Sequence, residues 1–232
     1  MTPRTIGVMG GMGPAATVEF YRRLVAATPA ERDQDHLHIL IDNDPSVPDR
    51  TAALLHGGED PGPALCRMAK RLEAAGAEML AMPCNTAHAY LDQITAAVEI
   101  PVINMLAETA QRLVNRSVGV MATSGTMETG LYERALANCG ARYLQPDSRG
   151  QATVDRAIRE IKRGVPPTEV SDALAEVARA LAAQGADAVV AGCTELSLVN
   201  GNGMELPWVD ALDVLVEATL REAWREGESV QP

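Results

Sequence analysis

Two of the four cysteines stand in similar settings. Cys84 lies in "AMPCNTAHAY" (81–90) and Cys193 lies in "VVAGCTELSL" (189–198). Each follows an apolar run that predicts a buried strand, and each precedes a predicted helix. Because a helix N-terminus presents unpaired N–H groups and positive potential, it favours a thiolate. The pattern therefore indicates two reactive thiols.

The residue types around these thiols limit the chemistry that they could perform. Asn85, Thr86 and Thr194 place short hydrogen-bond donors beside them, which suits a carboxylate. If the thiols faced each other across a cleft, one thiolate could remove a proton from a carbon. The opposing thiol could then return a proton to the other face. That reaction is a stereoinversion without a cofactor, and it predicts a duplicated fold with facing cysteines.

The remaining cysteines and the nearest histidine give weaker indications of a function. Cys66 and Cys139 fall within or at the end of helical patterns, where we expect packed thiols. The chain has no CxxC pair and no cysteine–histidine set with zinc-ligand spacing. His88 lies four residues after Cys84, so the sequence leaves open a cysteine hydrolase with a Cys–His pair.

Short apolar runs alternate with longer helical patterns along nearly the whole chain. Several runs are rich in Val, Ile and Leu without strict alternation, as expected for strands covered on both faces. Two helical patterns end on Gly76 and Gly185, which suit helix C-caps. The pattern predicts an α/β fold with mainly parallel sheets and ligands beyond the carboxyl ends of the strands. The predicted strands are 5–9, 37–41, 78–82, 101–105, 117–121 and 187–191, and the clearest helices are 15–28, 64–76 and 170–185.

The chain also resembles itself. Residues 5–24 align with 117–136 at an offset of 112. Residues 76–86 align with 185–195 at an offset of 109, which pairs the two cysteines. Two separate matches at nearly one offset indicate an internal repeat.

The repeat predicts two similar, pseudo-symmetric three-layer halves with an active-site cleft between them. We place the halves at residues 1–114, with Cys84, and 115–232, with Cys193. The C-terminal segment could cross back and pack on the first half. Facing halves would bring the two cysteines to opposite walls of one cleft.

Composition excludes several classes of partner. The 232 residues are 47% hydrophobic and 22% charged, with a net charge of −11, which argues against binding a phosphate backbone. No Lys/Arg cluster suggests an anionic membrane patch, and no apolar run approaches membrane-spanning length. The N-terminus lacks the apolar core of a signal peptide. We therefore expect a cytoplasmic protein that acts on a small molecule, without nucleic-acid or membrane partners.

Six motifs stand in register along the chain, namely "GVMGGMGPAATVEFY", "VPDRT", "MPCNTAH", "TSGTMETGLY", "IKRG" and "AGCTEL". Together they resemble the aspartate/glutamate racemase superfamily, in its PLP-independent aspartate racemase branch. The resemblance runs from residue 5 to about residue 213. The glutamate racemase branch differs, typically with Asp-Ser-Gly near the first strand and "GCTHYP" at the second cysteine.

The resemblance implies roles for particular residues. Cys84 and Cys193 are implied as the two proton-transfer residues of a homodimeric enzyme that needs no cofactor. The implied substrate-binding residues are Asn85, Thr86, Thr126 and Thr194 at the α-carboxylate and ammonium groups, Arg50 at the distal carboxylate, Lys162 on a closing loop or helix, and Met12 on the cleft floor.

Three acidic residues leave questions. Asp42 and Asp44 precede Arg50 where fewer acids are expected, and acids at a pocket mouth would repel a dicarboxylate unless they face away or pair with Arg50. The amino acid accepted is therefore left open. Glu195 fits either a helix cap or a hydrogen-bond partner in the site.

Other functions compete with racemisation of aspartate. Gly11, Gly13 and Ala16 fit a loose dinucleotide-binding loop, with Asp42 or Asp44 as the ribose-binding acid. That interpretation leaves both cysteine motifs unexplained. Maleate isomerases and arylmalonate decarboxylases share the superfamily and use the cysteines differently. A non-catalytic binding module could also use the same cleft.

Overall fold

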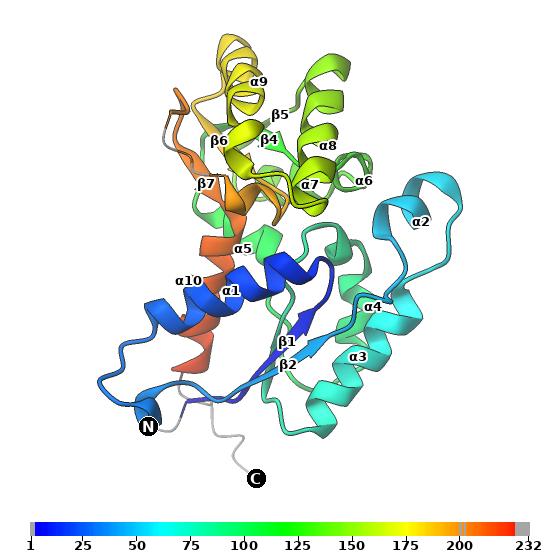
Figure 1. The fold of residues 1–232 in the computed structure, drawn as a ribbon, viewed down its shortest axis with the longest axis vertical. Helices are drawn as coiled ribbons and strands as arrows, with labels where there is room; N and C mark the ends of the chain where they lie inside the picture. The colour runs from blue at the N-terminus through cyan, green and yellow to red at the C-terminus, as the bar shows by residue number, and fades with distance from the viewer. Residues whose placement is uncertain (1–2, 200, 202, 226–232) are drawn as a thin grey trace.

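The computed structural model describes residues 3–199, 201 and 203–225, which form two parallel β-sheets with helices around them (Figure 1). The first sheet has the strand order β2-β1-β3, and the second has the order β5-β4-β6-β7. Parallel sheets alternating with helices confirm the predicted α/β class. The strands are β1 (Ile6–Gly10), β2 (Ile39–Asn43), β3 (Met79–Ala81), β4 (Ser117–Met121), β5 (Arg142–Leu144), β6 (Ala188–Ala191) and β7 (Trp208–Asp210).

Helices connect the strands and cover both faces of each sheet (Figure 1). The three predicted helices form as α1, α3 and α9. Gly76 and Gly185 follow α3 and α9 with φ of 100° and 94°, the left-handed conformation that a C-cap glycine supplies. The helices are α1 (Pro14–Ala27), α2 (Arg50–His56), α3 (Gly62–Ala74), α4 (Leu91–Thr95), α5 (Met105–Gln111), α6 (Ser124–Glu128), α7 (Leu131–Ala137), α8 (Ser148–Lys162), α9 (Ser171–Ala183) and α10 (Ala211–Ala223), with short 3-10 turns η1 (Asp33–Asp35), η2 (Thr86–Tyr90), η3 (Pro167–Glu169) and η4 (Leu196–Leu198).

Strand β1, at the centre of the first sheet, is buried on both faces. Ile6 and Val8 of β1 pack in one core cluster with Phe20 of α1, whereas Met9 packs in another cluster with Leu65 of α3. Alternate residues of one strand thus enter two different cores, which explains why the strand sequence shows no polar side.

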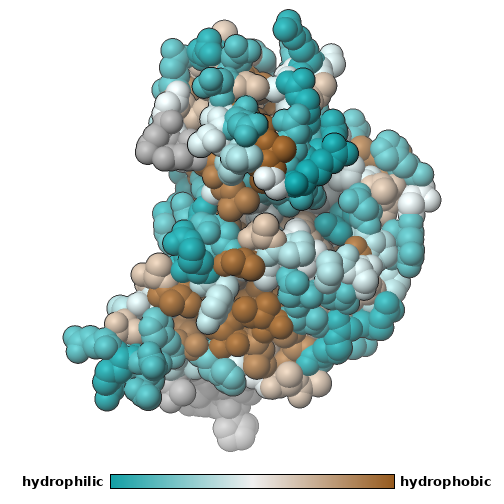
Figure 2. Space-filling view, in the orientation of Figure 1, coloured by the Kyte–Doolittle hydropathy of each residue, from teal (hydrophilic) through white to brown (hydrophobic). Residues whose placement is uncertain are grey.

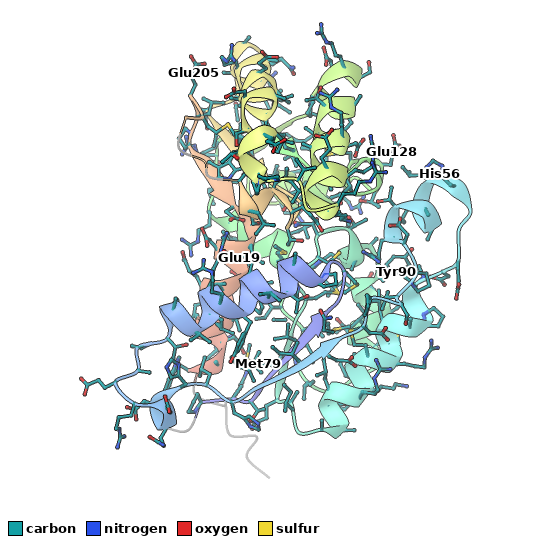
Figure 3. All side chains as sticks on the ribbon, viewed as in Figure 1. Glu19, His56, Met79, Tyr90, Glu128 and Glu205 are labelled. Carbon is teal, nitrogen blue, oxygen red and sulfur yellow. The ribbon has the colours of Figure 1, made fainter. Side chains whose placement is uncertain are left out.

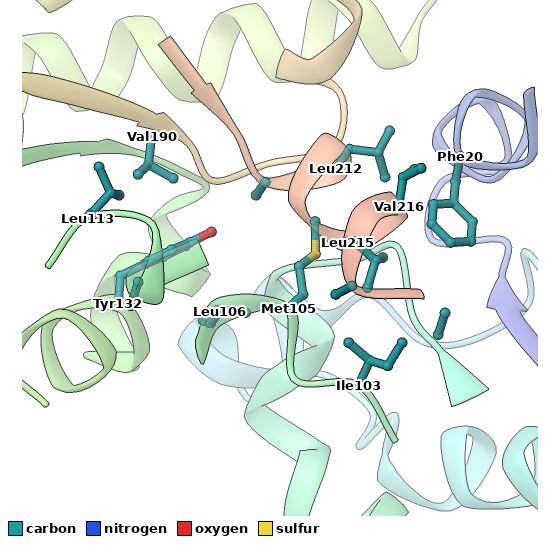
Figure 4. Close-up of a cluster of buried hydrophobic side chains, with 14 of the residues drawn as sticks. Phe20, Ile103, Met105, Leu106, Leu113, Tyr132, Val190, Leu212, Leu215 and Val216 are labelled. Carbon is teal, nitrogen blue, oxygen red and sulfur yellow. The ribbon is translucent and has the colours of Figure 1, made fainter. Parts of the chain in front are cut away.

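The second sheet is sandwiched in the same way, and the two halves share a core. Val190 of β6 lies in the same cluster as Ile103, Tyr132 and Leu215, residues that come from both halves (Figure 4). The opposite face of the sheet packs on α8 and α9 through a separate cluster that includes Leu181. Apolar packing of this kind fixes the relative position of the two halves.

Strand register supports the internal repeat. Ile6 pairs with Met79 in the first sheet, and the residues at the two sequence offsets, Val118 and Ala188, pair in the second. The repeat also shares a close helix contact. A Cβ on Gly7 would lie 3.3 Å from the Leu72 Cβ, and a Cβ on Gly119 would lie 3.1 Å from the Leu181 Cβ. Glycine lets a helix approach the central strand at the same place in both halves.

Three local predictions were wrong or incomplete. Residues 101–105 do not form a full strand, because only Val102 bridges to Leu80 before α5 begins at Met105. Strands β5 and β7 were missed; each has three residues and partly exposed side chains. The elements after the two cysteines are the 3-10 turns η2 and η4 rather than long helices.

The C-terminal helix returns to the first half. Helix α10 contacts α1 and α5, and the Arg4 amide donates to the Ala223 carbonyl oxygen at 2.9 Å. Helix α10 belongs in sequence to the second half, so the boundary at residue 114 stays a prediction. None of the helices in the described ranges is long and apolar enough to cross a membrane.

The face of the molecule drawn in Figure 2 is largely hydrophilic. Figure 2 shows a hydrophobic area beside α1 and β2. These two elements carry three exposed large apolar side chains, Val18, Tyr21 and Ile41.

Candidate active site

A small pocket lies where the central strands of both sheets end. Met12 follows β1, Cys84 follows β3, Thr123 follows β4 and Cys193 follows β6. This is the position that the parallel topology predicts for a ligand. The pocket is lined by Met12, Asp49, Arg50, Thr51, Cys84, Asn85, Thr86, Thr123, Lys162, Cys193, Thr194 and Glu195.

The structure brings together the residues singled out in the sequence. Eight of the nine predicted site residues line this pocket, and both cysteines are among them. The ninth, Thr126, does not line it, although its hydroxyl lies 2.8 Å from the Thr86 hydroxyl. The roles given to these residues stay predictions.

The Cys84 wall is held by neutral hydrogen bonds. The Met105 amide donates to His88 Nε2 at 3.1 Å, so the proton of the neutral ring is on Nδ1, which donates to the Cys84 carbonyl oxygen at 2.8 Å. Burial lowers the pKa of His88, which favours this neutral form. Both ring nitrogens thus bind backbone groups rather than the Cys84 thiol. The geometry argues against the hydrolytic Cys–His pair.

Asn85 is oriented by a buried tyrosine. The Tyr132 hydroxyl donates to Asn85 Oδ1 at 2.6 Å, and burial raises the pKa of Tyr132, so this hydroxyl keeps its proton. Asn85 Nδ2 is buried and has no hydrogen-bond partner among the described residues. Since a buried amide left without a partner is costly, this N–H group is suited to donate to a ligand oxygen.

Three threonine hydroxyls join the two halves at the pocket wall. Thr86 lies 3.0 Å from Thr123 and 2.8 Å from Thr126, and the last two lie 3.0 Å apart. Thr86 belongs to the first half, and its partners cap and begin α6 in the second. A hydroxyl both donates and accepts, so this triangle can turn one donor toward a bound oxygen.

The Cys193 wall is charged. The Cys193 thiol donates to Glu195 Oε2 at 3.0 Å, and Lys162 Nζ lies 3.7 Å from Glu195 Oε1. Burial, and then the negative charge of Glu195, raise the pKa of Cys193 well above its usual range, while Lys162 opposes them. Burial lowers the pKa of Lys162, but the charge of Glu195 and the thiols outweigh it and raise that pKa overall. The expectation of a favoured thiolate was therefore wrong for Cys193, because its turn is too short to offset burial beside a carboxylate.

Arg50 places a second cation, and a buried one, at the pocket. It is the first residue of α2, and its guanidinium donates to the carbonyl oxygens of Val47, Pro48 and Met12 at 3.0–3.3 Å. No carboxylate of the described residues pairs with it, and its buried Nε has no partner there. A guanidinium held only by neutral groups is suited to an anionic ligand.

The acidic residues before Arg50 lie elsewhere. Arg71 Nη2 lies 2.7 Å from Asp42 and 3.6 Å from Asp44, and neither acid lines the pocket. Asp49 does line it, but its carboxylate caps α2 by accepting from the Ala52 amide at 2.7 Å. The predicted repulsion by Asp42 and Asp44 therefore does not arise at this pocket.

The sequence reasoning missed three residues that line the pocket. Asp49 and Thr51 flank Arg50 within "VPDRT", and Thr123 begins "TSGTMETGLY". All three belong to motifs already identified in the sequence. These motifs were enough to find them, but only one residue of each motif was predicted to lie in the site.

The glycines after β1 serve packing. Gly11 has a φ of 92°, and a Cβ there would lie 2.4 Å from the backbone of Asp44. A Cβ on Gly13 would lie 3.2 Å from Glu195 Oε1. These contacts account for the glycines without a bound dinucleotide.

The α/β fold of the chain is similar to that of known racemases. Three-dimensional comparison matches Picrophilus torridus aspartate racemase with a TM-score of 0.84 and 28% identity, over 96% of this chain and 95% of that one. A putative Asp/Glu racemase from Yersinia pestis matches with a TM-score of 0.79 and 27% identity, over 96% and 100% of the two chains.

Sequence comparison places the chain in a family. Residues 9–219 match the model of the Asp/Glu/Hydantoin racemase family, and the chain belongs to that family. The broad specificity amino-acid racemase RacX of Bacillus subtilis is 27% identical over 224 residues, which cover 93% of this chain and 96% of that protein. The resemblance read from the motifs is thus confirmed.

Proposed function

We propose that this protein is a PLP-independent amino-acid racemase, with aspartate as its first candidate substrate and Cys84 and Cys193 as its two bases. One observation carries the proposal. Two cysteines at equivalent positions of two sheets, each only 5–6% exposed, line one small pocket. A single-base reaction would require only one of them.

The chemistry balances with the two thiols alone. One cysteine, as thiolate, takes the α-proton of the amino acid and becomes a thiol. The other cysteine, as thiol, gives its proton to the opposite face of the same carbon and becomes a thiolate. The intermediate carries negative charge on its α-carboxylate, where Asn85 Nδ2 and the hydroxyls of Thr86 and Thr194 can donate. One preorganised donor of this kind lowers a barrier by ~3–4 kcal/mol.

Arg50 supports a substrate with an acidic side chain. Its buried guanidinium has no carboxylate partner among the described residues, and Lys162 adds a second positive charge on the Cys193 wall. Asp42 and Asp44 are engaged by Arg71, which removes the objection to a dicarboxylate. We therefore rank aspartate first and glutamate second. Neutral amino acids follow, because one relative is a broad specificity racemase.

Chiral chromatography tests this function. Protein treated with hydroxylamine and a metal chelator is incubated with the L and D forms of aspartate, glutamate, alanine and lysine. We expect each enantiomer of aspartate to convert to a racemic mixture. Maleate and an arylmalonate are included in the panel. Turnover of either without racemisation of any amino acid would replace the proposal with isomerase or decarboxylase activity, and no turnover of any compound would favour a binding module.

The quaternary state and location rest on the resemblance and the composition. We propose a homodimer in the cytoplasm. Sedimentation velocity tests the first part, with about twice the chain mass as the expected result.

A further inference from the structure

The two cysteine loops differ at one equivalent position. The offset of 109 that pairs Cys84 with Cys193 also pairs Thr86 with Glu195. Both side chains line the pocket, and each is less than a tenth exposed. A neutral hydroxyl thus stands on one wall where a carboxylate stands on the other.

These two side chains have different partners. Thr86 turns to the hydroxyls of Thr123 and Thr126 and makes no hydrogen bond to Cys84. Glu195 does not cap the turn that it begins; its Oε2 accepts from the Cys193 thiol at 3.0 Å. The carboxylate is therefore a hydrogen-bond partner in the site, which decides between the two roles that the sequence left open.

We propose that Glu195 holds the proton on Cys193 in the resting site, so that Cys193 begins as the acid and Cys84 as the base. An ionised carboxylate only accepts hydrogen bonds, so at 3.0 Å it favours the thiol form of Cys193 over the thiolate. This inference deepens the proposed function and rests on it for its catalytic consequence.

The other charged groups of the pocket fit this assignment. Lys162 lies 3.7 Å from the far oxygen of Glu195 and partly offsets its charge. Asp49 is occupied with the α2 amide, and Arg50 is held by backbone carbonyls. Among the described residues, no carboxylate is hydrogen-bonded to the Cys84 thiol, whereas the pKa of Cys193 is raised by its burial and by Glu195.

The assignment has a consequence for the reaction. The enantiomer whose α-proton faces Cys84 can react with the resting protonation state, whereas the other enantiomer needs the proton to move from Cys193 to Cys84 first. Two enantiomers in solution have equal free energy, so kcat/KM is the same in both directions. The asymmetry therefore appears in kcat and KM separately.

Alkylation of each thiol as a function of pH tests the proposal without requiring turnover. The protein is treated with iodoacetamide between pH 6 and pH 10, then digested, and each cysteine peptide is quantified by mass spectrometry. We expect Cys193 to become reactive at higher pH than Cys84. In Glu195→Gln, Cys193 should react about tenfold faster at pH 8, which corresponds to a pKa lowered by about one unit. Cys84 should change by less than twofold.

Asp49→Asn is the matched control. It removes a carboxylate that lines the same pocket but makes no hydrogen bond to either thiol, and Asn also serves as a helix N-cap. We expect both thiols to titrate as in the unmodified protein. If Glu195→Gln fails to fold, two other measurements test the proposal. One is the difference in reactivity between the two thiols of the wild-type protein, and the other is the reactivity of Cys193 in Glu195→Asp. That variant should shift Cys193 in the same direction by a smaller amount.

Two results would overturn the proposal. One is a Cys193 that reacts at the same pH as Cys84 or lower, and the other is a Glu195→Gln variant in which Cys193 does not react faster. Racemisation with equal thiols would refute this inference alone. Unequal thiols without racemisation of any amino acid would refute the proposed function while leaving the proton on Cys193 assigned.

Discussion

The loops that carry Cys84 and Cys193 have equivalent places in their sheets but are held by different forces. The Cys84 loop is fixed by neutral hydrogen bonds from His88 and Tyr132 inside the shared core. The Cys193 loop is fixed by charge. Arg23 donates to the Ser197 carbonyl oxygen and to Asp210, each at 2.5 Å. Two loops at equivalent positions thus form one neutral wall and one charged wall of the pocket.

The difference separates two tasks. A neutral wall can bind a substrate carboxylate without competing charge, through the Asn85 N–H that has no partner in the part of the chain that the structure describes. The charged wall sets protonation at Cys193 and places Lys162, at the end of α8, beside the pocket. Glu19 lies on α1 and also binds Arg23, so α1 ties the Cys193 loop to the first half (Figure 3).

The largest expected effect comes from removing either thiol. Cys84→Ala and Cys193→Ala should each lower kcat for racemisation by at least about a thousandfold, roughly 4 kcal/mol, because each removes one proton-transfer group. Chiral chromatography of initial rates measures this. Cys66→Ala and Cys139→Ala should stay within about twofold, since these thiols lie outside the pocket. Equal loss in all four variants would contradict specific roles.

The next effect concerns the charged wall alone. Arg23→Leu should lower the free energy of unfolding by about 2–4 kcal/mol, because it leaves the largely buried carboxylate of Asp210 without its cation. Urea unfolding measures the change. Arg22→Leu is the matched control, since Arg22 is an exposed neighbour whose one ion-pair partner within the described ranges is Glu19. It should cost less than about 1 kcal/mol. Similar losses in both variants would show that the Arg23 network does not hold the loop.

A pH-dependent effect should distinguish the neutral wall. The folded-state pKa of His88 is lowered below its unfolded value of about 6.5, so its contribution is complete above pH 6.5 and declines as the pH falls toward the lowered pKa. We therefore expect the free energy of unfolding to fall as the pH is lowered below 6.5. His88→Gln should remove this component, whereas His56→Gln, at an exposed position on α2, should retain it (Figure 3). Identical pH profiles in all three proteins would refute the assignment.

The smallest effect concerns the acids outside the pocket. Asp42→Asn breaks a partly exposed pair with Arg71, which should cost less than about 1 kcal/mol. The ratio of aspartate to alanine turnover should not change, because Asp42 does not line the pocket. A change in that ratio would show that Asp42 influences substrate choice.

Much of the fold could be predicted because it depends on repeated local patterns. The strands at 5–9 and 117–121 are apolar, are preceded and followed by turn residues, and carry Gly7 and Gly119 where a helix packs closely. Strands β5 and β7 were not predicted, because each has only three residues, which are partly exposed. They lie at the two edges of the second sheet. Their strand structure comes from neighbouring strands rather than from their own composition.

The site was predictable in its membership but not in its electrostatics. The motifs predicted Arg50, Lys162 and both cysteines as site residues, and all four line one pocket. The partners of Arg71, the orientation of Glu195 and the proton on His88 depend on distances between segments far apart in the chain. The position of Thr126 depends on such a distance too: it does not line the pocket, but its hydroxyl lies 2.8 Å from the hydroxyl of Thr86, which does.

Solvent deuterium incorporation tests the central claim most directly. L-aspartate and D-aspartate are incubated separately with the protein in deuterated water, and α-proton loss is followed by NMR while the enantiomers are resolved by chiral chromatography. The two-base account predicts that the newly formed enantiomer carries deuterium at the α-carbon from the first turnover, because the second thiol bears a solvent-derived proton. Product that retains the original α-proton would show that one base serves both faces, and it would contradict the account.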